Sequence, residues 1–240
     1  MISGLDSAVP EIQTKQYVKS KISHSVMSFV FDSRTVNRLY KKLSSSVSIA
    51  RTELIYSNHF ELLIAVMLTA QATDKIVNEV TPSIFKKYSS PKSFILCGEK
   101  KIAHLIKRIG LAPTKAKNII RTCQILLKNH NGVIPKTREE LVEFPGVGRK
   151  TANVVLNEAF GKPTIAVDTH VFRVANRTGL AKGKTVLETE KKLIEVTPDM
   201  WKKDAHHYLI LHGRYVCKAK NFECLNCAIK KECQYENKTK

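Results

Sequence analysis

Apolar residues recur at helical spacing along almost the whole chain, and no segment shows the strict alternation expected of a strand. One predicted helix covers about 58–70, with apolar positions at Phe60, Leu63, Ile64, Met67 and Leu68. Another begins near Pro113, a residue suited to the first turn of a helix. Its apolar stripe comprises Ala116, Ile119, Ile120, Cys123, Leu126 and Leu127. Short polar, Gly or Pro breaks divide the chain into roughly ten helices. The pattern predicts an all-α fold.

The segment 138–160, REELVEFPGVGRKTANVVLNEAF, predicts two helices joined by a tight glycine turn. The first helix ends at Phe144, the turn Pro145-Gly146-Val147-Gly148 follows, and the second helix begins at about Arg149. Glycine permits unusual backbone angles and leaves space for a phosphate, which the free N–H groups of the new helix would face. Such a helix–hairpin–helix grips the DNA backbone without reading sequence. The alternative is an ordinary helix–turn–helix connection, against which the basic pair Arg149-Lys150 argues.

Lys150, at the mouth of this turn, has two interpretations. It is either one more phosphate contact or a nucleophile, since an amine beside Arg149 and desolvated by DNA is disfavoured in its charged form and can attack carbon. Asp168 follows 18 residues later in Ala166-Val167-Asp168-Thr169-His170, which leads into another apolar-patterned helix. It is well placed as the N-cap of that helix. A carboxylate near an attacking amine could instead stabilise a cationic sugar or move protons.

The charge of the chain favours a polyanionic partner. The 240 residues include 40 Lys and Arg against 21 Asp and Glu, a formal net charge of +19. Residues 101–150 contain eleven basic and three acidic side chains, so the excess lies in folded sequence and favours DNA or RNA over a membrane surface. A cationic surface that serves only solubility is the alternative.

The N-terminal residues 1–30 contain three Lys, two acids and no Arg. They show neither a signal nor a transit peptide layout, and we expect a poorly ordered extension, with Met27 as an alternative start. No run reaches the roughly 18 apolar residues of a membrane span. A cytoplasmic protein is expected, and the clustering of cysteines agrees with a reducing compartment.

Four of the six cysteines lie close together near the C-terminus, with the spacing C-x6-C-x2-C-x5-C: Cys217, Cys224, Cys227 and Cys233. Thiolates at short intervals are soft ligands for zinc or an iron–sulfur cluster. Zinc ribbons have two C-x2-C pairs about 15 to 20 residues apart, whereas this cluster has one pair. The remaining Cys97 and Cys123 are interpreted as packing residues. The nearby histidines are interpreted as packing or surface residues: His206, His207 and His212.

The runs LVEFPGVGRKTANVVLNEAFG, PTIAVDTHVFRVANRT and HGRYVCKAKNFECLNCAIKKEC, in this order, closely resemble the endonuclease III family. These are bifunctional DNA glycosylase/lyases of base-excision repair. The resemblance covers 31–240, with HFELLIAVMLTAQATD near its start. It implies that Lys150 attacks C1′ of a damaged nucleotide, expels the base and forms a Schiff base, after which β-elimination cuts the strand 3′ to the abasic site. It implies that Asp168 assists deprotonation and stabilises the charged sugar.

The resemblance also implies the substrate and the other site residues. The substrate would be an oxidised pyrimidine or an abasic site in double-stranded DNA, bound by a monomer at the bacterial nucleoid. Gln71 and Leu111 would fill the hole left by the extruded nucleotide. The four cysteines would hold a [4Fe–4S] cluster. The expected DNA contacts are Gln71, Leu111, Gly146, Val147, Gly148, Arg149, Lys218 and Lys220.

The architecture implied is a two-domain helix–hairpin–helix glycosylase fold. A six-helix barrel would span 52–162 and contain the hairpin at about 138–157, while 31–51 and 163–240 would form a four-helix iron–sulfur domain. Two other functions compete with this one. An adenine-mismatch glycosylase would lack Lys150 and carry a further C-terminal domain. A non-enzymatic DNA-binding protein with a structural metal would use Lys150 only for phosphate.

Overall fold

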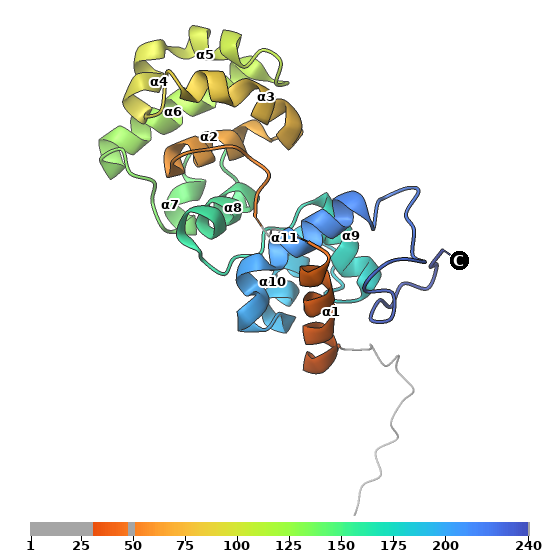
Figure 1. Cartoon of the computed structure of the whole chain (residues 1–240). Helices are drawn as coiled ribbons and strands as arrows, with labels where there is room; N and C mark the ends of the chain where they lie inside the picture. The colour runs from red at the N-terminus through yellow and green to blue at the C-terminus, as the bar shows by residue number, and fades with distance from the viewer. Residues whose placement is uncertain (1–30, 48–50, 240) are drawn as a thin grey trace, which may run out of the picture.

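The computed structural model describes residues 31–47 and 51–239, and helices are the regular structure found in them. The prediction of an all-α fold is confirmed. These residues form eleven helices, one more than the roughly ten expected (Figure 1). In chain order they are α1 Ser33–Ser45, α2 His59–Leu68, α3 Asp74–Phe85, α4 Pro91–Cys97, α5 Glu99–Leu105, α6 Ala112–His130, α7 Arg138–Val142, α8 Arg149–Phe160, α9 Thr169–Thr178, α10 Val186–Val196 and α11 Asp199–Tyr215.

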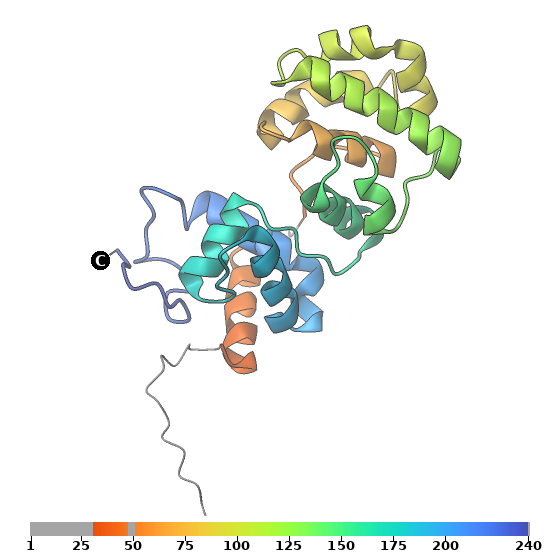
Figure 2. The ribbon, with the colours of Figure 1, turned by 180° about the vertical axis from the view of Figure 1, so that it is seen from behind.

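The helices pack around two separate hydrophobic cores, which appear as two lobes from both sides of the molecule (Figures 1 and 2). The α2–α8 lobe encloses the first core and contains the hairpin helices α7 and α8. The α9–α11 lobe, which includes α1, encloses the second core together with Ile229 near the C-terminus. Cys123 is completely buried in the first core and Cys97 packs partly buried against it, so the packing interpretation of both is confirmed.

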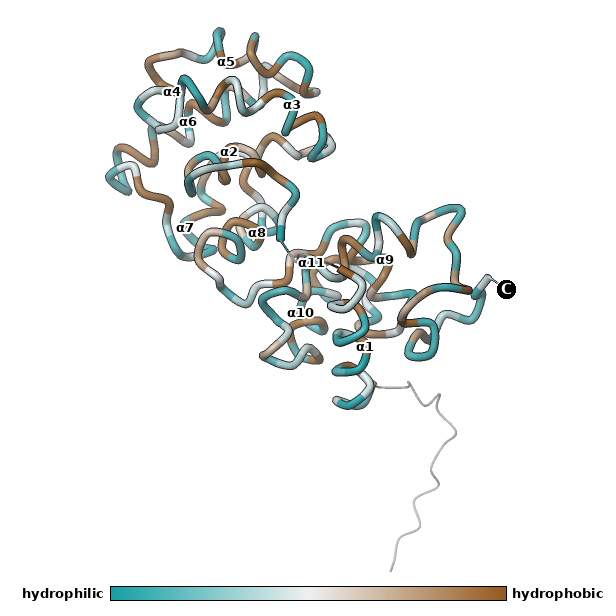
Figure 3. Tube along the Cα trace, in the orientation of Figure 1, coloured by the Kyte–Doolittle hydropathy of each residue, from teal (hydrophilic) through white to brown (hydrophobic). Residues whose placement is uncertain are grey.

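The position of each helix follows from its hydrophobic pattern. Helix α2 is apolar on nearly every side and forms the centre of the α2–α8 lobe, where the tube is largely brown in Figure 3. Helix α1 is apolar on one face only, which it buries through Val36, Leu39, Tyr40 and Leu43. None of the helices within the described ranges is both long and apolar enough to cross a membrane.

The two lobes are tied together by the segment that follows α8. Its residues alternate between the cores, since Ile165 and Val167 enter the second core while Ala166 enters the first. The buried amide of Asn157 donates hydrogen bonds to the carbonyl oxygens of Lys162, Thr164 and Lys203 at 3.1, 3.0 and 2.9 Å. Lys203 belongs to α11, so this one side chain joins the lobes and fixes the cleft between them.

Candidate active site

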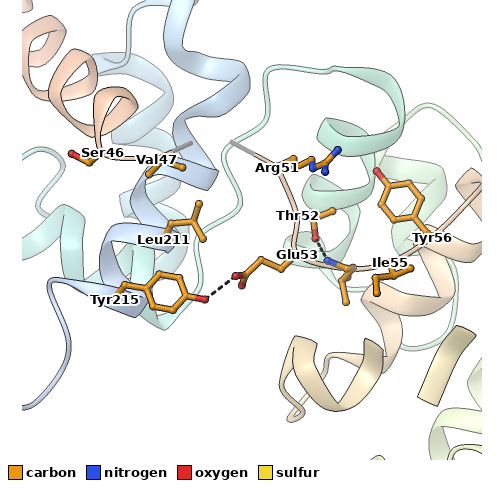
Figure 4. A pocket seen from close by; sticks show the side chains of 10 residues that line it. Ser46, Val47, Arg51, Thr52, Glu53, Ile55, Tyr56, Leu211 and Tyr215 are labelled. Atoms are coloured by element: carbon orange, nitrogen blue, oxygen red, sulfur yellow. Dashed lines mark hydrogen bonds between the residues drawn. The ribbon is translucent and has the colours of Figure 1, made fainter. Parts of the chain in front are cut away.

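Lys150 lines a cavity between the two lobes. The other walls come from the segment before α2, from α3 and from α11. The polar residues of its lining are Arg51, Thr52, Glu53, Thr69, Asp74, Lys150, His206, His207 and Arg214. A larger neighbouring cavity of about 750 Å³ shares the wall formed by 51–54 and is closed by Leu211 and Tyr215 (Figure 4). Among the described residues, the lining of the larger cavity includes no lysine, so the smaller cavity with Lys150 is the candidate site.

The start of α8 is open to an anion. Lys150 is an exposed residue in the first turn, after an N-cap, Gly148, that has no side chain to cap the helix. The first turn also contains no acidic residue. The N-terminal N–H groups of a helix lack partners within the helix and carry partial positive charge. The hairpin therefore presents unpaired donors and a primary amine at the same end of α8.

Asp168 caps α9 in the opposite lobe. Its Oδ1 accepts hydrogen bonds from the backbone N–H groups of His170 and Val171 at 2.9 and 2.8 Å. The N-cap role predicted from the sequence is confirmed. Asp168 remains half-buried, and no hydrogen bond to its Oδ2 occurs within the described ranges. One carboxylate oxygen is thus committed to the helix and the other is available for a ligand.

His206 is a buried histidine whose pKa is affected by both Lys150 and Asp168. Its Nδ1 lies 2.7 Å from the carbonyl oxygen of Ala166, which fixes the proton on Nδ1 and leaves Nε2 as an acceptor. Burial, together with neighbouring His207, lowers the pKa of His206 to about 4; the charge of Asp168 raises this pKa, and Lys150 lowers it slightly. Both Lys150 and Asp168 therefore lie within electrostatic reach of one neutral imidazole. Lys150 and Asp168 come from opposite lobes, and the charges of both act on His206.

Sequence reasoning missed the ion pairs beside this cavity. His207 Nε2 lies 2.5 Å from Glu158 Oε1, and both side chains are buried. Burial raises the pKa of Glu158, but the hydrogen bond and charge of His207 outweigh it, so the net pKa is lowered. The sequence signal that could have indicated this pair is Glu158 itself, a carboxylate on the otherwise apolar face of the helix that follows the hairpin turn.

A second group of charges crosses the cleft near Lys150. Arg214 of α11 pairs with Asp74 Oδ2 at 2.8 Å and with Glu53. The hydroxyl of Tyr215 donates to Glu53 Oε1 at 2.7 Å, as Figure 4 shows. These contacts join α11 to the segment before α2 and to the first turn of α3. They therefore link the two lobes across the cavity.

The predicted DNA-contacting residues of the hairpin have different surroundings. Gly146 adopts a φ of 81°, Gly148 is exposed, and Val147 is buried in the first core. The guanidinium of Arg149 is bonded to the buried carboxylate of Glu190 on α10, with Nη2 to Oε1 at 2.8 Å. The side chain of Arg149 thus connects the two lobes. Its backbone N–H is the part of the residue that is left for the predicted DNA contact.

Gln71 and Leu111 lie on neighbouring exposed turns of the α2–α8 lobe. Gln71 follows α2, and Leu111 is the N-cap of α6. Both have a left-handed backbone, with φ of 56° and 62°. Leu111 is 55% exposed, so it is not a core leucine.

The four C-terminal cysteines line one largely apolar cavity. N–H donors lie near two of the sulfurs: Arg177 Nη1 at 3.7 Å from Cys217 and the Tyr235 backbone at 3.4 Å from Cys233. His212 Nε2 lies 3.7 Å from the sulfur of Cys227, and its tautomer decides which of the two donates. Within the described ranges no three Cys, His, Asp or Glu side chains converge as ligands of one metal ion would. Four thiols around one cavity, with N–H donors near sulfur, are a donor set that suits zinc or an iron–sulfur cluster.

The loop between Cys217 and Cys224 is held in place by the side chain of Arg177. Arg177 donates to the carbonyl oxygens of Lys218 and Ala219 at 2.7 and 3.2 Å. Its guanidinium also lies over the rings of Phe222 and Tyr235, at 4.3 and 5.1 Å from their centroids. The side chains of Lys218 and Lys220 are exposed on this ordered loop.

Comparison with known proteins identifies the family. Residues 64–199 match the HhH-GPD superfamily, described as base excision DNA repair proteins. Endonuclease III of Rickettsia prowazekii is 52% identical over 200 residues, covering 83% of this chain and 94% of the relative. Endonuclease III of Escherichia coli is 54% identical over 187 residues, covering 78% of this chain and 89% of the relative. The chain belongs to the endonuclease III family.

A solved endonuclease III structure agrees with this membership. "Structure of a Trapped Endonuclease III-DNA Covalent Intermediate: Estranged-Adenine Complex" superposes with a TM-score of 0.80 at 42% identity, covering 85% of this chain and 97% of that one. The predicted helix–hairpin–helix glycosylase fold is therefore confirmed. As a member of the endonuclease III family, the chain is a base-excision repair enzyme rather than a non-enzymatic DNA-binding protein. It is a DNA glycosylase that repairs oxidised pyrimidines and has AP lyase activity.

Proposed function

We propose that Lys150 is the nucleophile of this glycosylase and lyase. Its neutral Nζ attacks C1′ of the damaged nucleotide, the C1′–N bond breaks and the base leaves. The C1′–O4′ bond of the sugar then breaks and O4′ takes up a proton, which converts the amine adduct into a Schiff base that joins Nζ to C1′. Loss of a proton from C2′ then expels the 3′ phosphate, which cuts the strand 3′ to the abasic site. The observation that carries this proposal is the position of the Lys150 amine in the inter-lobe cavity, within electrostatic reach of the same imidazole as Asp168.

Asp168 would stabilise the cationic sugar and assist deprotonation. Its Oδ1 is held by two backbone N–H groups, so the carboxylate has a fixed orientation and Oδ2 would be left to interact with the sugar. Neutral His206 adds no cation to a site where positive charge develops. The trapped covalent complex of the endonuclease III relative supports attack by a protein group on DNA.

The substrate would be double-stranded DNA that contains an oxidised pyrimidine or an abasic site. Reaction at C1′ requires that the nucleotide leave the stack, and a damaged base is easier to unstack. Gln71 and Leu111 would fill the space it leaves, and their exposure on adjacent turns supports this role.

The phosphates would bind at two places. The hairpin would contribute the backbone N–H groups of Gly146, Gly148 and Arg149, while the side chain of Arg149 stays with Glu190. The predicted contact by Val147 is not included, because its N–H already donates to the carbonyl oxygen of Phe144 at 2.9 Å and its side chain is buried. Lys218 and Lys220 would meet the backbone from the cysteine loop. Neither contact reads sequence, as expected of an enzyme that recognises damage.

Cys217, Cys224, Cys227 and Cys233 would hold a [4Fe–4S] cluster. When bound, it would supply a rigid structural centre that orders the loop of Lys218 and Lys220. The cavity lined by all four cysteines and the N–H donors near sulfur support a metal centre here. The presence of one C-x2-C pair, instead of the two pairs of a zinc ribbon, supports iron–sulfur over zinc. Visible absorption with iron and sulfide in equal amounts in anaerobically purified protein is the expected finding, and stoichiometric zinc without it would contradict the assignment.

The two lobes would correspond to domains at 52–162 and at 31–51 with 163–240. The contents of the two hydrophobic cores support this division. We further propose that the chain acts as a monomer on chromosomal DNA in the bacterial cytoplasm, since both lobes of one chain line the cavity around Lys150. The predicted extension at 1–30 lies outside the described residues.

The decisive experiment is borohydride trapping on a duplex with thymine glycol. Wild-type protein should form a covalent adduct, Lys150→Ala should form none, and Lys162→Ala should trap like wild type because Lys162 is exposed just beyond the other end of α8. DNA affinity measured for the same variants separates binding from chemistry. Wild-type protein that binds this duplex and gives no adduct, or Lys150→Ala that still cuts the strand, would contradict the proposal.

A further inference from the structure

Two exposed turns of the α2–α8 lobe have strained backbones. Within the described ranges, four residues other than glycine have positive φ: Gln71, Leu111, Asn131 and Asn221. Asparagine adopts this conformation readily, whereas glutamine and leucine seldom do. Strain of this kind persists only where surrounding contacts enforce it, and it concentrates at functional sites. The conformations of Gln71 and Leu111 therefore require a contact that enforces them.

A buried lysine lies between these two turns. Lys115 is in the first turn of α6 and is only 7% exposed, although lysine is almost never buried without a partner. Its Nζ donates a hydrogen bond to the carbonyl oxygen of Leu68 at 2.9 Å. Its backbone N–H donates to the carbonyl oxygen of Leu111, also at 2.9 Å. One residue is thus bonded to the end of α2, three residues before Gln71, and to Leu111 itself.

The charge of Lys115 suits the end of α2. The last carbonyl groups of a helix carry partial negative charge, and a cation there is stabilising. Helix α2 has no basic residue in its own last turn, so Lys115 supplies the cation from α6. Burial lowers the pKa of Lys115. The hydrogen bond to the carbonyl oxygen of Leu68 offsets part of the cost of burying this amine.

We propose that Lys115 is a positioning residue that holds the Gln71 and Leu111 turns in one fixed relation, so that both side chains enter the duplex together when a nucleotide is extruded. The proposal rests on the proposed function of Gln71 and Leu111 in filling the vacated space. The strain stored at both positions would be maintained by the hydrogen bond from Lys115 to Leu68. Breaking that bond would let each turn relax independently.

The test compares Lys115→Met with wild type on two duplexes, one with thymine glycol and one with a preformed abasic site. Extrusion is followed by the fluorescence of 2-aminopurine placed opposite the lesion. We expect Lys115→Met to slow extrusion and base excision about tenfold, because misplaced groups lose rate steeply. Strand cleavage at the abasic site should fall less than about threefold, because no base has to be unstacked there.

Three further variants complete the test. Lys128→Met, exposed near the far end of α6, is the matched control and should behave as wild type. Lys115→Gln is a second variant if Lys115→Met does not fold, since its neutral side chain is too short to reach Leu68. Leu111→Ala alone and combined with Lys115→Met should give less than additive losses, because both changes affect the same step.

The outcomes separate this proposal from the proposed function. Wild-type extrusion by a folded Lys115 variant would overturn the proposal, as would equal losses on both duplexes that follow the fall in Tm. If Gln71→Ala and Leu111→Ala both leave extrusion unchanged, the role proposed for these two residues fails and the role of Lys115 fails with it. Normal trapping by Lys115→Met on the abasic duplex would show that the chemistry of Lys150 is intact in either case.

Discussion

Asp168 has a structural and a chemical role that two substitutions separate. Asparagine caps helices as well as aspartate does, so Asp168→Asn should keep the hydrogen bonds to His170 and Val171 and change stability by less than about 0.5 kcal/mol. Asp168→Ala should lose about 1 kcal/mol. Both should lower base excision about a hundredfold, because the negative charge is gone. Thermal unfolding measures the effect on stability, and single-turnover rates measure the effect on base excision. An Asp168→Asn protein with the wild-type rate would show that Asp168 serves only as a helix cap.

At this scale the sequence predicted the residues whose role is local. The N-cap role of Asp168 and the position of Lys150 at the start of a helix follow from neighbouring residues, and both were predicted correctly. The partners of Arg149 and Glu158 could not be predicted, because Glu190 and His207 lie 41 and 49 residues away on other helices. Pairs at such separation depend on how the lobes pack, which hydrophobic periodicity does not describe.

The hairpin between α7 and α8 contains two glycines with different requirements. Gly146 has a φ of 81°, and an added Cβ would lie 2.8 Å from Asn118 Nδ2, so Gly146→Ala should cost about 1 to 2 kcal/mol of stability. An added Cβ at Gly148 meets nothing within 4 Å, so Gly148→Ala should leave stability nearly unchanged. It should still weaken DNA binding about tenfold, because the methyl group would occupy the space proposed for a phosphate.

Denaturant unfolding and binding to an undamaged duplex test both variants. A Gly148→Ala protein that binds as tightly as wild type would mean that no phosphate approaches this turn. Wild-type stability of Gly146→Ala would mean that the turn relaxes without cost. The two glycines are two positions apart, so each variant serves as the control for the other.

Individual helices were predicted well because their signals are contained in the segment itself. The helix expected at about 58–70 is observed at His59–Leu68, and the second helix of the hairpin begins at Arg149 as predicted. The shifts at the ends reflect caps such as Asn58, whose side chain accepts the N–H of Glu61. The division of the helices between two cores rests on the family resemblance alone, since each amphipathic pattern shows that a face is buried and not what covers it.

The two lobes are joined largely by buried polar contacts. Three of these contacts are made by side chains of α8 with the α9–α11 lobe. They are the hydrogen bond of Asn157 to Lys203, the pair of Glu158 with His207, and the pair of Arg149 with Glu190. The same helix presents Lys150 at its N-terminus. Because polar contacts depend on direction more than apolar ones do, they fix the orientation of α8 across the cleft as well as its position.

This arrangement predicts that the side chain of Arg149 acts between lobes rather than on DNA. Arg149→Gln leaves the buried carboxylate of Glu190 without its cation, so we expect a loss of about 2 kcal/mol, moderated because the arginine is partly exposed. Adding Glu190→Gln should restore much of that stability, since two amides can pair without a buried charge. The slope of log affinity against log salt should stay within about 0.5 of wild type. A side chain that contacts a phosphate would instead lower the slope by about one, with no rescue by Glu190→Gln.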